Sequence, residues 1–189
     1  MWLYVALGVV ALLAVLAVVV AMQPAGFKIT RTMEMRAPAS EIFPHINDMR
    51  EWLAWSPWEK LDPTMKREYD GAAGVGQVYS WEGNKNVGAG RCTIVDSRPD
   101  ELVRMRLEMF KPFAADNDAV LALQPTKSGT AVTWSMAGKR NFFFKAMGLV
   151  MSMDKMCGGA FEQGLTDLKE IVEGEGAASQ QGQLVGGGV

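Results

Sequence analysis

The side chains that could perform nucleophilic or metal chemistry are few in this sequence. The chain has one histidine, His45, and two cysteines, Cys92 and Cys157. This is too few for a structural zinc site, and a triad built on His45 would lack a recognisable nucleophile, because no G-x-S-x-G motif occurs. Two buried free thiols fit the cysteines better than a disulfide, which the sequence nevertheless permits. We therefore expect neither a metal nor a cofactor.

Asp154 is the acidic residue whose position best suits acid–base catalysis. It interrupts an apolar series at helical spacing near the end of the chain. An apolar pocket would raise the pKa of its carboxyl group, and an enzyme could then pair Asp154 with Tyr69 or Tyr79. The alternative, which we favour, is that Asp154 reaches the rim of the pocket or forms an ion pair, with Arg104 or Arg106 as the partner. Catalysis is therefore an alternative and not the expected function.

The stretch EWLAWSPWEK, residues 51–60, contains half of the 6 tryptophans in the chain. Trp52 and Trp55 are spaced for one side of a short helix, which Pro57 ends. We expect these two rings to pack the helix onto a sheet, and Trp58 to lie at the edge of a pocket. The stretch therefore indicates packing rather than a ligand-binding aromatic box.

The elements that must position these residues begin with an apolar segment. Residues 1–22 carry no charged side chain and are long enough to cross a bilayer as a helix. A cleaved signal peptide is the alternative, but no Lys or Arg precedes the apolar run and no clear cleavage site follows it. Positive charges from Lys28 to Arg36 follow the segment, which favours a cytoplasmic domain. We expect a single-pass protein with a transmembrane helix at 1–23 and a linker at 24–26.

Alternation of apolar and polar residues predicts a series of β-strands after this segment. The first strand runs from Phe27 to Met35, and two short helices follow it. Six further runs are separated by turns that contain Gly, Pro or Asp, so an antiparallel meander is expected. These strands are predicted at 64–71, 76–83, 86–99, 101–110, 116–125 and 129–138.

One long helix is predicted at 140–173. Apolar residues recur through it at steps of three and four, from Phe143 to Val172. A helix of this length reaches about 50 Å, which is enough to cross a whole sheet. After Glu173 the sequence is rich in Gly and Gln and lacks periodicity, so we expect residues 174–189 to form a disordered tail.

Four segments, in this order, resemble the START/polyketide cyclase-like (SRPBCC) superfamily, in particular its bacterial members with a membrane anchor. They are APASEIFPHINDMREWLAWSPW, GVGQVYSWEGNKNVGAGRCTI, GTAVTWSMAG and LTDLKEIVE. The resemblance covers about residues 27–172 and predicts a helix-grip domain at 27–173. It implies an α+β helix-grip fold, in which a curved seven-stranded antiparallel sheet wraps around a long C-terminal helix, here preceded by one N-terminal transmembrane helix. It also implies the inner membrane of a bacterium, but no fixed reaction.

The helix-grip fold implies a cavity for a hydrophobic ligand between the sheet and the long helix. The 13 methionines suit a pocket that adapts its shape, although the same side chains could fill a solid core. Strand parity and helix phase select the residues that would line it. They are Trp58, Tyr69, Tyr79, Trp81, Met105, Leu107, Met109, Trp134, Met136, Met147, Met151 and Phe161.

Phenylalanines next to basic residues mark the expected entrance of this cavity. They occur in FKPFAADN (110–117) and KRNFFFKAMG (139–148). Apolar rings beside cations are typical of a surface that touches anionic lipid, and in this fold both segments border the entrance. The predicted entrance residues are Phe110, Phe113, Phe142 and Phe143.

These observations favour a binding protein over other classes. The net charge of −2, with Lys and Arg scattered along the chain, excludes the basic footprint of a nucleic-acid-binding protein. We expect a protein anchored in the membrane by residues 1–22 that binds a lipid-like, isoprenoid or polyketide-like molecule. The alternatives are a cyclase or dehydratase that uses a pocket carboxylate, and an accessory subunit that docks onto a membrane protein complex.

Overall fold

The computed structural model of the chain describes residues 2–140, 142–149 and 153–186. Within these ranges, the side chains of Phe143, Met153, Lys155, Met156 and residues 177–186 are not described. Met151, one of the predicted cavity residues, lies outside the described residues.

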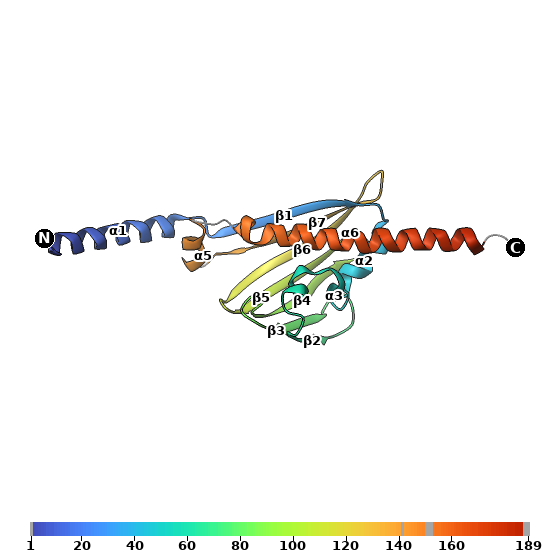
Figure 1. Ribbon diagram of the computed structural model, residues 1–189, viewed down its shortest axis with the longest axis horizontal. Coiled ribbons are helices and arrows are strands. Elements are labelled where there is room, and N and C mark those ends of the chain that lie inside the picture. The colour runs from blue at the N-terminus through green and yellow to red at the C-terminus, as the bar shows by residue number, and fades with distance from the viewer. Residues whose placement is uncertain (1, 141, 150–152, 187–189) are drawn as a thin grey trace.

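The chain folds into the order of elements that the sequence predicts, with two differences: three short helices follow the first strand instead of two, and the long helix is divided (Figure 1). The strands are β1 (Gly26–Met35), β2 (Lys66–Asp70), β3 (Val78–Glu82), β4 (Ala89–Arg98), β5 (Leu102–Lys111), β6 (Ala115–Pro125) and β7 (Thr130–Lys139). The helices are α1 (Trp2–Met22), α2 (Ala39–Asn47), α3 (Trp52–Trp55), α4 (Pro57–Leu61), α5 (Phe142–Met147) and α6 (Met153–Gly186).

The strands form one antiparallel sheet in the order β1-β7-β6-β5-β4-β3-β2. Strands β2 to β7 pair with their neighbours in the chain, and β1 joins the sheet beside β7. Register shifts between β4 and β5, at Ala89/Gly90 and at Ile94/Asp96, introduce bulges that bend the sheet. The long helix α6 runs along the sheet (Figure 1). The predicted seven-stranded helix-grip fold is therefore confirmed.

The core lies between α6 and one face of the sheet, which we call the inner face. On α6, Phe161, Leu165, Leu168 and Val172 recur at steps of four, three and four, so they share one side of the helix, and all are buried. Each such side chain contributes about 1.5–3 kcal/mol by leaving water. Trp134 of β7 stacks on Phe161 with ring centroids 4.4 Å apart. Direct packing therefore holds this part of α6 on the sheet.

The tryptophans of residues 51–60 pack a helical corner onto this core. Trp55 of α3 has no exposed surface, and its Nε1 donates to the carbonyl oxygen of His45 at 3.0 Å. Its ring lies 5.4 Å from Trp52 and 5.5 Å from Trp134 of the sheet, measured between centroids. This confirms the interpretation of the stretch as packing.

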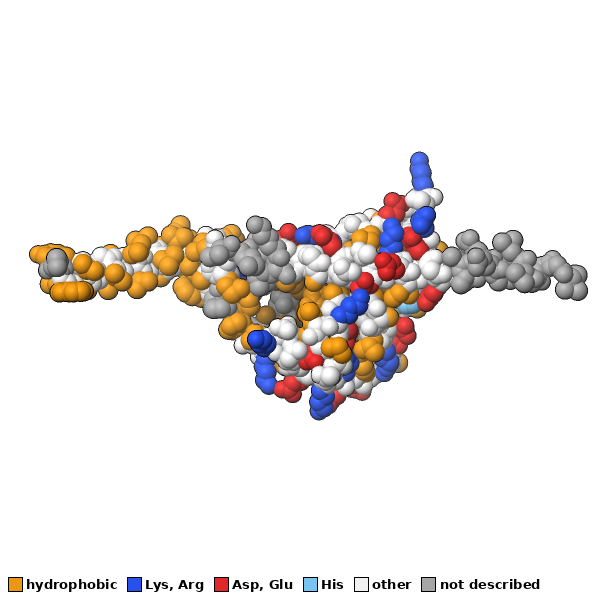
Figure 2. Space-filling view, viewed as in Figure 1, with side chains coloured by type: hydrophobic (Ala, Val, Ile, Leu, Met, Phe, Trp, Pro, Cys, Tyr) orange, Lys and Arg blue, Asp and Glu red, His pale blue; other side chains and the backbone are white. Residues whose placement is uncertain are grey.

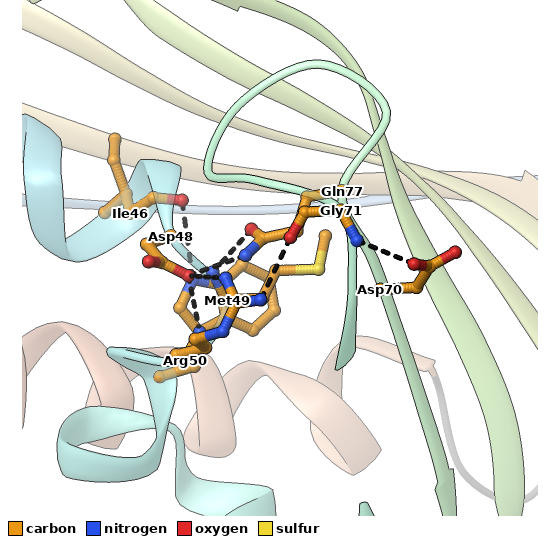
Figure 3. Close-up of polar contacts among 8 residues, drawn as sticks. Ile46, Asp48, Met49, Arg50, Asp70, Gly71 and Gln77 are labelled. Atoms are coloured by element: carbon orange, nitrogen blue, oxygen red, sulfur yellow. Dashed lines mark hydrogen bonds and ion pairs between the residues drawn. The ribbon is translucent and has the colours of Figure 1, made fainter. Parts of the chain in front are cut away.

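A polar network fastens the same corner to the loop between β2 and β3 (Figure 3). Asp48 Oδ1 accepts hydrogen bonds from Gln77 Nε2 at 2.6 Å and from the backbone N–H of Arg50 at 3.0 Å. The fully buried Gln77 in turn accepts from the Met49 N–H at 2.9 Å, and Arg50 donates to the Gly71 carbonyl at 2.9 Å. Burial raises the pKa of Asp48, but these hydrogen bonds outweigh it and hold that pKa below its ordinary value.

The long helix predicted at 140–173 differs from the structure at both ends. It is divided, since α5 ends at Met147 and α6 begins at Met153. At the other end α6 continues to Gly186, whereas the sequence predicts a disordered tail from residue 174. An existing helix extends at little cost through Ala, Gln and Glu, because only its nucleation is strongly unfavourable.

Helix α1 is long and apolar enough to cross a membrane. Its side chains are exposed except for Val20, which is buried. At its end Lys145 Nζ of α5 donates to the Ala21 carbonyl at 3.1 Å, and Arg140 donates to the Pro24 carbonyl at 2.7 Å. Helices α1 and α5 therefore lie together where β1 begins and β7 ends. We call this the α1 end of the sheet (Figure 1).

Candidate ligand-binding site

The inner face is apolar and only partly covered at the α1 end. Phe27 of β1 and Leu107 and Met109 of β5 lie there in phase with buried inner-face residues such as Met105, yet all three are half-buried. Met136 of β7, nearby in the sheet, is buried. Figure 2 shows hydrophobic side chains around a hollow near the start of α6. The apolar wall is thus less completely packed at this end than at the other.

The other predicted wall residues pack against one another farther from α1. Met105, Trp134 and Phe161 are buried. Trp58 of α4 makes edge contacts with Trp134 and Phe161, with ring centroids 5.6 Å and 6.0 Å apart. In this half the side chains act as a solid core, which was the alternative interpretation of the sequence. They form the floor against which a ligand at the α1 end would rest.

Two of the predicted entrance residues lie near α1. Phe142 of α5 is exposed, and Phe113, between β5 and β6, makes an edge contact with Phe144 of α5 with ring centroids 5.6 Å apart. Met147, predicted on the long helix opposite the sheet, is instead on α5, because the helix is divided after it. The side chain of Phe143 is among those not described.

Phe110 is not at this entrance. Strand β5 continues to Lys111, so Phe110 alternates with Met109 and points to the outer face of the sheet. There the Arg91 guanidinium lies 6.0 Å from its ring centroid. Phe110 and Lys66 help to line an outer hollow of about 320 Å³. The prediction for Phe110 is wrong because the residue belongs to the end of a strand and not to a loop.

The tyrosines predicted to line the cavity surround a buried carboxylate instead. Glu59 of α4 accepts a hydrogen bond from Arg67 Nε at 2.6 Å and another from the Tyr79 hydroxyl at 2.5 Å. The Tyr69 and Tyr79 rings stack with centroids 4.9 Å apart, and the Trp81 centroid lies 5.5 Å from that of Tyr79. Glu59 and Arg67 were not singled out from the sequence. Strand parity could have indicated Arg67, because it lies two residues from Tyr69 on the same face of β2.

This cluster keeps its tyrosines neutral. Burial raises the pKa of Tyr79, and its hydrogen bond to Glu59 raises it further, because a phenolate would face a carboxylate. Burial is the main cause that raises the pKa of Tyr69, and the negative charge of Glu59 raises it further. Burial lowers the pKa of Arg67, but its contact with Glu59 outweighs this and leaves the pKa raised. A hydroxyl proton is thus held on Tyr79 against a buried acceptor.

Asp154 is not an acid in an apolar pocket. Its side chain is 54% exposed, and both carboxylate oxygens accept from Arg31, at 2.8 and 3.0 Å. These hydrogen bonds hold the pKa of Asp154 below its ordinary value, the opposite of what pocket acid–base chemistry needs. The favoured ion pair is therefore present, but with Arg31 of β1 rather than Arg104 or Arg106. Arg31 also contacts Glu162, and a Cβ atom at Gly158 would overlap its guanidinium.

The residues singled out for nucleophilic or metal chemistry are dispersed. His45 borders a surface hollow of about 490 Å³ beside α2, and its Nε2 lies 3.3 Å from Glu175 Oε2 of α6. Cys92 and Cys157 are free thiols, as favoured from the sequence. Burial raises the pKa of Cys92 to about 12 and that of Cys157 in the same direction, which suppresses their nucleophilic thiolate forms.

One polar side chain interrupts the apolar wall at the α1 end. Asn117 of β6 is 8% exposed and lies opposite Leu107 of β5 and Gly138 of β7. Asn117 was not singled out from the sequence, although the alternation along β6 places it in phase with the buried residues Ala119 and Leu121.

The sheet, the helix across it and the apolar inner face define a helix-grip protein. The chain belongs to the family described as polyketide cyclase / dehydrase and lipid transport, whose model matches residues 26–173. This confirms the family resemblance seen in the sequence.

Solved structures of low sequence identity share the fold. A protein from Chromobacterium violaceum is 15% identical with a TM-score of 0.56, covering 80% of this chain and 99% of that one. Norcoclaurine synthase from Thalictrum is 13% identical with a TM-score of 0.59, covering 80% and 96%. The di-domain ARO/CYC StfQ from the steffimycin biosynthetic pathway is 10% identical with a TM-score of 0.61, covering 81% and 52%. No curated protein matches significantly.

Proposed function

We propose that the protein is a membrane-anchored binding protein for a hydrophobic small molecule, held between α6 and the inner face at the α1 end. The observation that carries the proposal is the half-buried state of Phe27, Leu107 and Met109, beside a fully packed core on the same face. An apolar ligand in contact with these side chains would remove their remaining surface from water, which is favourable. The family description, which includes lipid transport, supports the same class of function.

The neighbourhood of the site supports delivery of the ligand from a bilayer. Helix α1 has the length and apolar surface of a membrane span, and α5 contacts its end. Phe142 and Leu149 are exposed beside Lys145 and Arg140, a combination that suits the boundary between lipid tails and headgroups. In this proposal α1 anchors the protein in the inner membrane of a bacterium, the domain is cytoplasmic, and the ligand enters near α5.

Organic extraction of the full-length protein tests the proposal directly. The protein is purified in a mild non-ionic detergent, extracted with organic solvent and analysed by mass spectrometry. We expect one class of apolar molecule to be enriched over an unrelated single-pass protein that is purified in parallel. A protein that carries no such molecule, and that also fails to take up a fatty acid or a long-chain alcohol in native mass spectrometry, would contradict the proposal.

A matched pair of variants locates the site. Leu107→Trp adds a large ring to the inner wall, and Arg106→Trp adds the same ring to the outer face one residue away. We expect Leu107→Trp to weaken binding of the enriched molecule by roughly tenfold, because the added ring occupies the space for the ligand. Arg106→Trp should bind normally, since Arg106 is exposed on the outer face, where it pairs with Asp116 and Glu108. Thermal unfolding of both variants verifies that they fold.

The buried Glu59–Tyr79 contact supports a second candidate function, acid–base catalysis on a bound ligand. Glu59 could receive a proton through Tyr79, and the fold also occurs in norcoclaurine synthase and in an ARO/CYC protein. Incubation of the purified protein with its extracted ligand would then convert the ligand, and Glu59→Gln would abolish the conversion without abolishing binding. A ligand that stays unchanged with the wild-type protein would exclude this candidate.

A further inference from the structure

Asn117 is a polar side chain within an otherwise apolar part of the proposed binding site. Its Cα pairs with Leu107 on one side and Gly138 on the other, and Phe27 of β1 pairs with Gly138 in turn. The strand register therefore places Asn117 in the row that runs across the inner face at the α1 end.

The amide of Asn117 has an unused acceptor. Its Oδ1 is buried and has no hydrogen-bond partner among the described residues. A buried carbonyl oxygen without a donor is unfavourable, so such groups are rare in folded proteins and call for an explanation. The missing donor is one that a bound molecule can supply.

Gly138 fixes the place of this oxygen. A Cβ atom at Gly138 would overlap Asn117 Oδ1 and would also approach the Phe27 ring to 3.0 Å. The amide therefore occupies the space that a side chain at Gly138 would fill, on the inner face and beside Phe27. The unpaired oxygen faces the same region as the half-buried apolar side chains, and not the outer solvent.

We propose that Asn117 anchors the polar end of the ligand, and that this end is a neutral hydrogen-bond donor such as a hydroxyl group. The inference rests on the proposed binding function and narrows its ligand class. A ligand hydroxyl donates to Asn117 Oδ1, and the apolar remainder contacts Leu107, Met109 and Phe27. An asparagine amide can also donate to the oxygen of the same hydroxyl.

The surroundings of Asn117 disfavour a charged ligand group. Its neighbours Leu107, Gly138 and Phe27 carry no charge, and an ionised carboxylate or phosphate buried without a cation is strongly unfavourable. The arginine of the β1 inner face, Arg31, already contacts Asp154 and Glu162. The site should therefore prefer a long-chain alcohol over the fatty acid of the same length.

Three probes of equal chain length test this preference: dodecanol, its methyl ether and dodecanoate. Each is titrated into the full-length protein in a non-ionic detergent, and bound fractions are measured by native mass spectrometry. We expect wild-type protein to bind dodecanol on the order of tenfold more tightly than the ether or the acid, the range that one buried hydrogen bond provides. Asn117→Leu, similar in size, should bind dodecanol and the ether equally. Asp118→Asn, on the outer face of the same strand, should keep the preference.

The outcomes separate this inference from the function on which it rests. If wild-type protein binds none of the three probes, the proposed binding function itself fails. If it binds the alcohol and the ether equally, or if Asn117→Leu keeps the preference for the alcohol, the role of Asn117 is refuted. Asn117→Ala, which removes the amide without adding bulk, replaces Asn117→Leu should the latter not fold. Asn117→Ala should likewise bind dodecanol and the ether equally. If this variant still preferred dodecanol, the proposal would also be refuted.

Discussion

At the scale of single residues, the molecule combines complete packing with a few buried polar groups that have defined partners. Trp55 is enclosed by its own helix, by the α2 backbone and by the sheet. Glu59 satisfies its two oxygens with Arg67 and Tyr79. Asn117 Oδ1 lacks such a partner among the described residues, which is why it is assigned to ligand binding.

Trp55→Ala should destabilise the protein strongly. The indole has no exposed surface, so its removal leaves a cavity and loses the hydrogen bond to His45, at a cost of about 3–5 kcal/mol. The free energy of unfolding in urea measures this effect. Leu53→Ala, in the same short helix but with an exposed side chain, is the control and should change stability by no more than about 0.5 kcal/mol. A small effect at Trp55 would show that the corner is not part of the core.

Tyr79 should make the protein sensitive to alkali. Its pKa is raised in the folded state, so its stabilising contribution is complete below the unfolded value of about 10 and is lost as the pH rises above that value. The free energy of unfolding of the wild type should fall more steeply above this pH than that of Tyr79→Phe, by up to about 1.4 kcal/mol per pH unit. Equal slopes in urea titrations of the two proteins would contradict the prediction.

At the scale of elements, ion pairs join α6 to β1 and to Arg36, the residue that follows β1. Near its start, Asp154 and Glu162 contact Arg31 of β1. Farther along, Glu173 accepts from the backbone N–H of Arg36 at 2.8 Å. We therefore expect the Arg31 contacts to hold the start of α6 against β1, beside the proposed site.

Asp154→Asn should loosen the start of α6 without unfolding the domain. The pKa of Asp154 is lowered by Arg31, so the ion pair stabilises at neutral pH and is lost as the pH falls below the ordinary carboxyl value of about 4. Hydrogen exchange of the first turns of α6 should be several-fold faster in the variant at neutral pH, and the difference should vanish in acid. Glu170→Gln, exposed on the same helix, should exchange like the wild type. If Asp154→Asn and the wild type exchanged at the same rate, the ion pair with Arg31 would not be what holds the start of α6 in place.

At the scale of the whole molecule, two helices extend from opposite ends of the sheet (Figure 1). Helix α1 leaves the end where β1 begins, and α6 continues past the far end to Gly186. The half-buried apolar wall, α5 and the proposed entrance share the end that carries α1. This arrangement places the proposed binding site close to the bilayer if α1 is the membrane anchor.

Removal of residues 1–23 should separate membrane attachment from folding. The shortened chain should lose its association with the membrane fraction, because no other helix among the described residues is long and apolar enough to cross a bilayer. Its sheet should remain intact, since the main contacts of α1 with the described helices and strands are with α5. Fractionation and circular dichroism measure the two effects. A truncated chain that unfolds, or one that stays integrally in the membrane, would contradict the prediction.

The sequence by itself determined most of the order of elements, and its resemblance to a known family indicated the fold. Alternating side chains defined the seven strands, steps of three and four defined the apolar side of α6, and residues 1–22 defined an apolar helix. These are local patterns, and each is visible within one segment of the chain. The same information predicted that Trp55 packs a corner, because spacing and a following proline are also local features.

The tertiary structure alone decided how these elements pair their polar groups. Asp154 contacts Arg31, and Glu59 contacts Tyr79, across 123 and 20 residues of chain respectively. No local pattern selects such a partner, because many arginines and carboxylates share a similar spacing. The side of the sheet on which Phe110 lies depended on where β5 ends, and the unpaired Oδ1 of Asn117 depended on its neighbour Gly138. Strand register and helix placement fix these contacts, and both are products of the complete fold.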